Sequence, residues 1–336
     1  MTATSEALAA MMPPLERAWA DPITKAIDSS GELADRSGLT QTPEGKSILQ
    51  FSLAAATLLR PILRDPEMSA KLLDIVPGGD PTNPHYVLDL LPGAVAKRIW
   101  QGTPFAHNTL MFLEEYGFVA LGQRRKIRYV IADPLDESSL VETGLRVQTS
   151  GAVICNEHGE CLAGAITSLV DNTILLALRD HPPRLLNFDE YGGRLHEFQV
   201  EDPPNRHDIF RYQTLPRRID IMPKEFVDIY KYPSIPTMGG YAVLMLALGK
   251  QDFALDPKGQ DVNEAAIWYT IAQECGFPVT TLDGIPIDMP ARLLYAMRNR
   301  DMDQRIPAVI SRTAEIHRRV VPIPQVPVVS LIEAQN

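Results

Sequence analysis

The sequence predicts an α+β protein in which helices are layered on β-sheets. Residues 46–75 carry apolar side chains at helical spacing, whereas strand-like segments rich in β-branched residues dominate residues 126–170. In the last third of the chain, helical and strand-like segments alternate, which is typical of helices packed on sheets. With 336 residues, the chain is long enough for one large or two ordinary domains.

Composition and charge exclude several classes of protein. Hydrophobic residues make up 45% and charged residues 22% of the chain, the balance of a soluble globular protein. The longest apolar runs, Phe51–Leu59 and Tyr241–Leu248, are too short to span a membrane. A net charge of −10 argues against nucleic acid as the main partner, because phosphate backbones are bound by basic surfaces. We therefore expect neither a nucleic-acid nor a membrane partner.

The N-terminus and the cysteine content predict a cytoplasmic protein. The first residues lack the basic segment of a secretory signal. Three cysteines are too few for a disulfide framework, so reduced thiols are expected.

The first hundred residues predict mainly helices. Prolines interrupt residues 1–45, which favours an accessory helix or a loose arm outside the core. Pro61 interrupts the helical pattern of residues 46–75, so either one kinked helix or two helices fit that segment. Residues 86–101 are expected to begin as a strand and to continue as a helix.

The middle of the chain predicts a sheet. Lys126–Ala132 has a strand pattern that ends at an Asp-Pro turn. Leu145–Ile154 and Ala163–Val170 flank the polar segment CNEHGEC, which predicts a β-hairpin. That turn holds only two cysteines and one histidine as candidate metal ligands, fewer than a structural zinc site uses, so a purely structural role is favoured.

A Pro-rich, charged segment at residues 181–236 predicts a junction between domains. We therefore expect an arm at 1–45, an α+β domain at 46–182 and an α/β domain at 183–336. The elements predicted after the junction are helices at Tyr241–Leu248, Asn263–Cys275 and Thr313–Val320, and strands at Phe277–Leu282 and Ile306–Ser311.

Acidic residues at the ends of predicted elements are the candidates for chemistry. The usual phosphate-loop, dinucleotide, serine-hydrolase and zinc-protease motifs are absent from the sequence. Asp133 and Asp136 flank Pro134-Leu135 directly after a strand, an arrangement that suits Mg²⁺. Each acidic motif alone also fits a structural turn, a solvated helix end or, for Asp261, a helix N-cap.

Several motifs in order resemble one family. EEYG (114–117), IADPLDESS (131–139) and GQDVNEAA (259–266) resemble the metal-site motifs of the Mg²⁺-dependent, lithium-sensitive phosphatases, the superfamily of inositol monophosphatases and fructose-1,6-bisphosphatases. The segments 87–99, 238–255, 276–284 and 306–320 agree with the same pattern, so the resemblance extends over residues 85–320. It implies a layered α-β-α-β-α sandwich of the sugar-phosphatase type.

The resemblance also implies an activity, which is hydrolysis of a phosphate monoester on a small polyol or sugar phosphate. The protein would act on a small phosphorylated metabolite and form a dimer. Two or three Mg²⁺ ions would be held by Glu114, Asp133, the Leu135 carbonyl, Asp136 and Asp261. Asp89 and Ser138 would orient or deprotonate the attacking water, and Glu115 would support the metals. Substrate would be bound by Glu137, Ser138, Ser139, Gly239, Gly240 and Asp256.

Departures from the family pattern keep a second interpretation open. Glu137 stands where the family has glycine, and Gln260 stands where a tryptophan precedes the metal-binding aspartate. The acidic position that contacts a polyol hydroxyl in inositol enzymes is Ala254 here, with Asp256 as the substitute. The alternative is a divergent, non-hydrolytic member of the fold that binds or transforms a phosphorylated or anionic metabolite by other chemistry.

Overall fold

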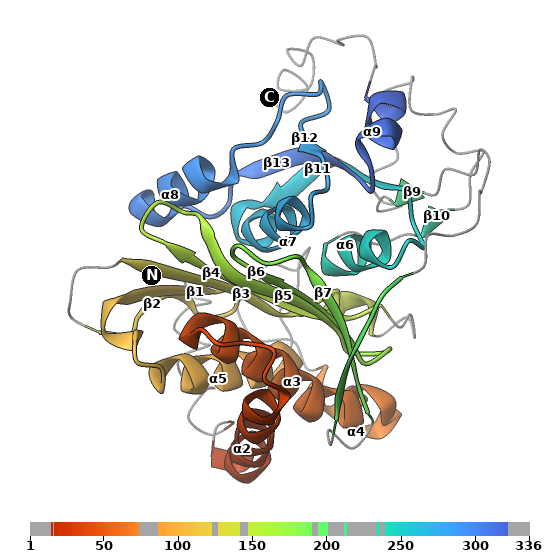
Figure 1. Ribbon diagram of the computed structural model, residues 1–336. Helices are drawn as coiled ribbons and strands as arrows, with labels where there is room; N and C mark the ends of the chain where they lie inside the picture. The colour runs from red at the N-terminus through yellow and green to blue at the C-terminus, as the bar shows by residue number, and fades with distance from the viewer. Residues whose placement is uncertain are drawn as a thin grey trace.

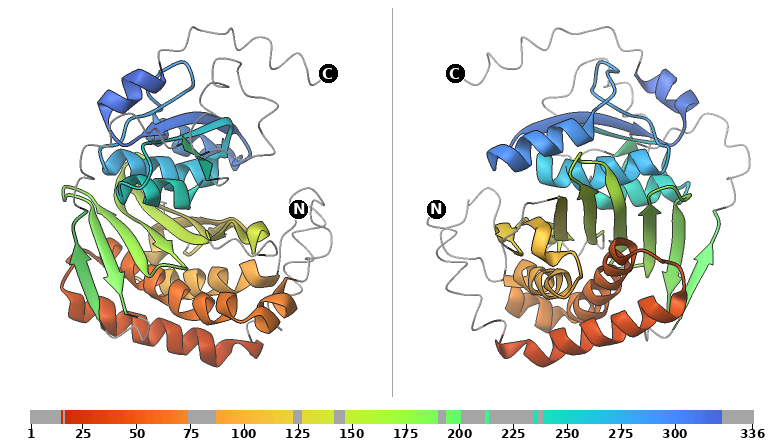
Figure 2. Two further views of the ribbon diagram at one scale, coloured as in Figure 1. Left: turned by 90° about the vertical axis from the view of Figure 1, so that its right-hand side faces the viewer. Right: turned by 60° about the vertical axis from the view of Figure 1, so that its left-hand side comes forward.

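The protein is a layered sandwich of helices and sheets (Figure 1). The computed structural model describes residues 15, 17–73, 87–122, 127–141, 147–189, 194–200, 212–213, 234–235 and 239–321. Most of the Pro-rich segment expected at 181–236 lies outside these residues. One helical layer covers the lower face of a large sheet, a second lies between that sheet and a smaller one, and α9 (Ala314–Val320) lies beyond the smaller sheet (Figures 1 and 2).

The lower layer is built from α2 (Ala20–Ser37), α3 (Pro43–Arg64), α4 (Pro66–Leu72) and α5 (Val87–Gln101). Residues 46–75 form two helices, one of the two alternatives expected. The break falls after Pro61, because Asp65 caps α4 by accepting hydrogen bonds from the backbone N–H groups of Glu67 and Met68. Helix α3 itself continues through Pro61 to Arg64.

Two expectations for the N-terminal third are wrong. The segment before residue 45 was expected to stay outside the core, but α2 buries Ile23, Ala26 and Leu33 in the main hydrophobic cluster. These positions are three and seven residues apart and therefore lie on one helix face. Residues 87–101 form a helix from Val87 onward, without the expected preceding strand within the described residues.

The large sheet has eight strands in the order β2-β1-β3-β4-β5-β6-β7-β8. Only the β1–β3 pair is parallel. The β4–β5 pair confirms the expected hairpin. The strands are β1 (Thr109–Leu113), β2 (Gly117–Ala120), β3 (Arg128–Asp136), β4 (Thr149–Asn156), β5 (Cys161–Ser168), β6 (Thr173–Leu178), β7 (Arg184–Phe188) and β8 (Leu195–Phe198). The short helices η1 (Ala106–Asn108) and η2 (Ser138–Leu140) precede β1 and follow β3.

The upper half holds a three-stranded sheet of order β11-β13-β12, with all neighbours antiparallel. The expected strand over 277–282 is shorter than predicted, since only Val279–Thr280 pairs with β13. The elements are α6 (Gly240–Ala247), β11 (Phe253–Asp261), α7 (Val262–Glu274), β12 (Val279–Thr280), α8 (Met289–Asn299) and β13 (Arg305–Ser311). A further two-stranded sheet pairs β9 (Tyr212–Gln213) with β10 (Ser234–Ile235).

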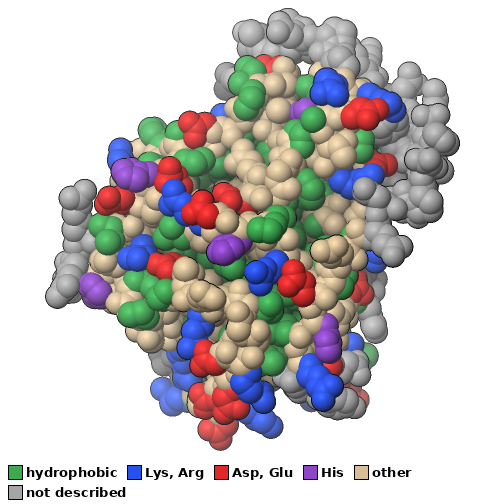
Figure 3. Space-filling model, viewed as in Figure 1, with side chains coloured by type: hydrophobic (Ala, Val, Ile, Leu, Met, Phe, Trp, Pro, Cys, Tyr) green, Lys and Arg blue, Asp and Glu red, His purple; other side chains and the backbone are tan. Residues whose placement is uncertain are grey.

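Hydrophobic cores lie on both faces of the large sheet. The lower core joins α2, α3 and α5 to the sheet, and the upper core joins α6, α7 and α8 to both sheets. No helix among the described residues is long and apolar enough to cross a membrane. On the face shown in Figure 3, acidic and basic side chains are intermingled.

Candidate active site

The end of β3 places two carboxylates inside the molecule. Register between β3 and β4 shifts between Asp133 and Asp136, so the strand bulges where the DPLD motif begins. Asp133 is 2% exposed and Asp136 is 8% exposed. The Asp133 Oδ1 accepts a hydrogen bond from the Leu135 backbone N–H at 3.2 Å, which fixes the turn.

Asp136 connects the large sheet to α6. Its Oδ2 accepts hydrogen bonds from the Thr149 hydroxyl at 3.0 Å and from the Gly240 backbone N–H at 2.9 Å. Gly239 has a φ of 76°, and a Cβ there would lie 2.5 Å from Asp136 Oδ2. Glycine is therefore required for the N-terminus of α6 to come this close to the carboxylate.

Glu114 comes from the neighbouring strand. Because β1 and β3 are parallel, Glu114 at the end of β1 lies beside the end of β3, and its backbone N–H donates to the Ala132 carbonyl at 3.2 Å. Its side chain is hydrogen-bonded to that of Asp133. Desolvation, followed by repulsion from Glu115, raises the pKa of Glu114 to about 8. Repulsion between two carboxyl groups this close disfavours their simultaneous ionisation.

Desolvation is also the main cause of the raised pKa values of the two aspartates. It raises the pKa of Asp133 well above its usual value, with repulsion from Glu114 as the next cause. The pKa of Asp136 is raised in the same way, with repulsion from Glu137 next. Among the described residues, no lysine or arginine forms an ion pair with Glu114, Asp133 or Asp136. Bound protons or a bound cation would therefore have to offset the repulsion among these three carboxylates.

Glu264 is a site residue that the sequence analysis missed. It lies in the first turn of α7, where Oε2 accepts a hydrogen bond from the Asp261 backbone N–H at 3.2 Å as half of a capping box. It repels both Asp133 and Asp136. Desolvation, followed by repulsion from Glu114, raises the pKa of Glu264 to about 8. The spacing Asp-x-x-Glu before an apolar helix was the signal that could have found it.

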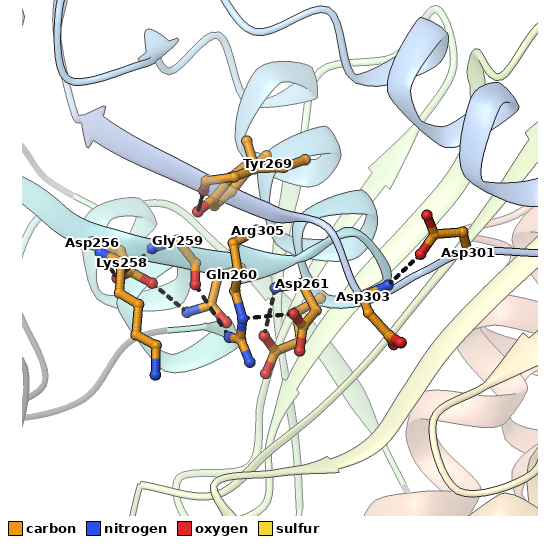
Figure 4. A network of polar contacts seen from close by, with 11 residues as sticks. Asp256, Lys258, Gly259, Gln260, Asp261, Tyr269, Asp301, Asp303 and Arg305 are labelled. Carbon is orange, nitrogen blue, oxygen red and sulfur yellow. Dashed lines mark hydrogen bonds and ion pairs between the residues drawn. The ribbon is translucent and has the colours of Figure 1, made fainter. Parts of the chain in front are cut away.

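Asp261, the expected metal ligand from this half of the molecule, is engaged elsewhere. Its Oδ1 forms an ion pair with Arg305 Nε at 2.7 Å, and Arg305 also donates to the Gly259 carbonyl at 3.3 Å (Figure 4). The Asp261 side chain is 28% exposed. We define the acidic cluster as Glu114, Asp133, Asp136 and Glu264, the carboxyl groups whose pKa values are raised.

Asp256, an expected substrate-binding residue, lies inside a bulge of β11. Its carboxylate accepts hydrogen bonds from the backbone N–H groups of Lys258 and Gly259 and from the Gln260 side chain (Figure 4). The side chain of Asp256 is fully buried. These contacts assign it a structural role in shaping the strand before Asp261, and the structure does not bring it to a surface that a substrate could reach.

Asp89 and Glu115 flank Glu114. Asp89 lies buried in the first turn of α5 and is one of the charges that raise the pKa of Glu114. The Tyr116 hydroxyl donates to the Leu90 carbonyl at 2.9 Å, which ties the EEYG segment to α5. A Cβ at Gly93 would lie 2.3 Å from the Tyr116 ring, so α5 packs closely at this point.

The turn after Asp136 contains the residues expected to bind phosphate. Glu137 has φ 62° and ψ 31°, a left-handed conformation that costs a non-glycine residue about 1–2 kcal/mol. It immediately precedes Ser138 in η2, and the Gln148 side chain donates to its carbonyl at 3.4 Å. The side chain of Ser139 is outside the described part of the molecule.

The donor set of the acidic cluster fits a hard divalent cation. Its four members supply only carboxylate oxygens, which Mg²⁺ prefers. No three His, Cys, Asp or Glu side chains among the described residues converge closely enough to hold a metal ion as they stand. A cation bound among these carboxylates would offset the repulsion that raises their pKa values.

Comparison of the structure with solved structures identifies the fold. The protein is similar to an inositol monophosphatase from Zymomonas mobilis, with a TM-score of 0.55 and 15% identity over 82% of this chain and 95% of that one. It is also similar to the extragenic suppressor protein suhB from Bartonella henselae, with a TM-score of 0.59 and 15% identity over 83% and 98%. An IMPase from Thermotoga maritima gives a TM-score of 0.58 at 15% identity over 82% and 94%. No protein-family model and no curated protein matches the sequence.

Proposed function

We propose that this protein is a divergent member of the inositol monophosphatase superfamily that hydrolyses a phosphate monoester on a small polyol or sugar phosphate. The observation that carries the proposal is the acidic cluster itself. Its carboxylates come from β1, β3 and α7, and they repel one another at the centre of a fold shared with inositol monophosphatases. Burial of several carboxylates is costly unless a cation or protons compensate.

Glu114, Asp133 and Asp136 are the side chains that would hold Mg²⁺, together with the Leu135 carbonyl. Bound Mg²⁺ would neutralise phosphate charge and acidify a water molecule. The Thr149 hydroxyl and the Gly240 N–H hold Oδ2 of Asp136 and so fix that carboxylate. The link between Asp133 Oδ1 and the Leu135 N–H fixes the second aspartate in the same turn.

Asp89 and Ser138 would position and deprotonate the attacking water. Asp89 lies close enough to Glu114 to raise its pKa, so it is within the electrostatic reach of the site. Ser138 follows the DPLD turn directly, and its hydroxyl can accept or donate a hydrogen bond. Glu115 would stabilise an additional cation beside Glu114.

The test is phosphate release from a panel of inositol, sugar and nucleotide monophosphates and bisphosphates, with Mg²⁺ and with EDTA. We expect Mg²⁺-dependent turnover of a polyol or sugar phosphate by the wild-type protein. Asp133→Asn should lower kcat by at least about a hundredfold, since changes to residues that merely support metal ligands already cost 10–100-fold. Asp35→Asn is the matched control, because Asp35 pairs with Lys46 on the surface of α2. Unchanged turnover in Asp133→Asn would contradict the assignment.

A further inference from the structure

Asp261 and Glu264, one N-terminal to α7 and one in its first turn, differ in their contact with Arg305. Asp261 is paired with the guanidinium of Arg305 at 2.7 Å. Glu264 forms no direct ion pair with a lysine or arginine in the described ranges; Arg305 attracts it from a distance, and the repulsion of Glu114 outweighs that attraction. A cation that binds near both would find Asp261 in direct contact with a guanidinium and Glu264 without such a contact.

The packing of α7 directs the face that carries Glu264 toward the end of β3. Trp268 lies one helical turn after Glu264 and therefore on the same face. Its ring packs against the backbone of Gly151, where a Cβ would lie 2.0 Å from a ring carbon. Gly151 is the register partner of Asp133 in the β3–β4 pair. The helix face of Glu264 is thus docked on the strand pair that carries Asp133.

The Trp268 ring makes a second contact that supports the same placement of α7. A Cβ at Gly240 would lie 2.9 Å from Trp268, so the ring also packs against the first turn of α6. The N–H of Gly240 holds the Asp136 carboxylate. Trp268 therefore fixes the position of α7 relative to both aspartates of the DPLD motif.

From these contacts we propose that Glu264, and not Asp261, is the carboxylate by which the α7 region binds the divalent cation, while Asp261 stays paired with Arg305. The inference rests on the proposed function, since it concerns the same metal site. The capping hydrogen bond from the Asp261 N–H uses Oε2 of Glu264, and a carboxylate retains further acceptor capacity for a cation at its other oxygen.

The test is binding of Mn²⁺ without substrate, measured as loss of the free Mn²⁺ signal by electron paramagnetic resonance. The variants are Glu264→Gln and Asp261→Asn. The amide oxygen of a glutamine can still accept the capping hydrogen bond, and thermal unfolding verifies that each variant is folded. Glu274→Gln is the matched control, because it removes the same charge from the other end of α7, ten residues or about 15 Å away.

We expect Glu264→Gln to weaken Mn²⁺ binding by at least about tenfold. Asp261→Asn should change the affinity by no more than about threefold, the effect of losing a partly exposed ion pair. Weak binding in Asp261→Asn together with wild-type binding in Glu264→Gln would overturn the inference and leave the proposed function standing. Absence of Mn²⁺ binding in the wild-type protein would overturn both.

The position of the ion gives a second readout that does not depend on variants. In crystals of the wild-type protein soaked with Mn²⁺, the anomalous peak should lie within coordination distance of a Glu264 oxygen and of Asp133. A peak that contacts Asp261, with Glu264 beyond coordination distance, would contradict the inference.

Discussion

Glu137 combines backbone strain with an added negative charge beside Asp136. Its φ of 62° lies in the left-handed region that favours glycine, and its carboxylate helps to raise the pKa of Asp136. We expect Glu137→Gly to raise the free energy of unfolding by about 1 kcal/mol, since it relieves a strain of this order. It should also increase phosphate release, because less negative charge would then oppose the phosphate. Chemical denaturation and the phosphate assay measure the two effects.

Asp180→Gly is the matched control for that variant. Asp180 is an exposed acidic residue with φ 61° in the turn after β6. Its replacement should stabilise the protein without any change in phosphate release. Lower turnover in Glu137→Gly than in the wild-type protein would contradict this expectation and show that the Glu137 carboxylate assists phosphate release. No turnover by the wild-type protein, with activity appearing in Glu137→Gly, would favour the non-hydrolytic alternative.

At the scale of single residues, the family resemblance grouped Glu114, Asp133 and Asp136 as one metal site. The structure places Glu114 beside β3 because β1 and β3 are parallel, a pairing that the sequence did not predict; the roles of these residues stay predictions. Glu264 was missed because only Asp261 of the GQDVNEAA motif was considered as a ligand. Asp256 was placed at the substrate as the substitute for the acidic position that is Ala254 here, because a shift of β11 relative to β13 cannot be inferred from composition.

At the scale of elements, the contact between α7 and the β3–β4 pair determines the geometry of the site. We expect Gly151→Ala to lower the free energy of unfolding by about 1–3 kcal/mol, because its Cβ would overlap the Trp268 ring. The displacement of α7 should also weaken Mn²⁺ binding. Chemical denaturation and Mn²⁺ titration test this expectation.

Gly102→Ala is the comparison for Gly151→Ala. The atom nearest to a Cβ at Gly102 is the Ile99 carbonyl oxygen at 3.4 Å, an ordinary contact. This control should leave stability and Mn²⁺ binding unchanged. Equal effects of the two substitutions would mean that the packing of Trp268 does not set the position of α7.

Helix α9 is joined to the small sheet through His317. Its Nε2 lies 3.0 Å from the Thr280 hydroxyl, and its Nδ1 lies 2.9 Å from the Ser311 hydroxyl. Burial lowers the pKa of His317 below its usual value of 6.5. The unfolded chain therefore binds a proton at a higher pH than the folded protein does, and the contribution of His317 to stability should fall as the pH drops below 6.5.

The measurement is the unfolding midpoint between about pH 7 and about pH 5.5 for the wild-type protein and for His317→Gln. As the pH drops below 6.5, the wild-type protein should lose stability relative to the variant, although the variant's overall stability is lower because the two hydroxyl contacts change. An identical pH dependence in both proteins would show that His317 does not contribute to it.

The elements that sequence reasoning misjudged share a physical cause. Prolines before residue 45 led to the expectation of an accessory helix or a loose arm outside the core, yet Pro22 lies near the start of α2, where a missing N–H costs nothing. The apolar face of α2 was sufficient to bury it against α3. The short β12 failed as a prediction because β-rich composition over 277–282 does not specify where pairing to β13 ends.

At the scale of the whole molecule, the layered architecture was predictable because the alternation of helical and strand-like segments survives at low sequence identity. The likeness to solved structures at 14–15% identity agrees with that expectation. The strand order of the large sheet was harder to predict. In that sheet β2 lies at the edge beside β1, and β1 pairs in parallel with β3. That parallel pair is what places Glu114 beside Asp133.

The acidic cluster links the stability of the whole molecule to pH and to the cation. The pKa values of Glu114 and Glu264 are raised from 4.5 to about 8, so the folded protein holds protons that the unfolded chain releases. Their stabilising contribution is complete below pH 4.5 and is lost as the pH rises through about 8. In EDTA, the unfolding midpoint should therefore fall between about pH 6.5 and about pH 8.5, a window above the His317 transition.

Mg²⁺ should reverse this loss. A cation that binds only the folded state stabilises it, and it replaces the protons that the cluster sheds at high pH. The increase in the unfolding midpoint on adding Mg²⁺ should consequently be larger at about pH 8.5 than at about pH 6.5. In Glu114→Gln, both the fall in EDTA and the Mg²⁺-dependent increase should shrink, because one titrating ligand is gone. If the wild-type midpoint in EDTA were independent of pH across this window, the four carboxylates would not be coupled in the way that their arrangement requires.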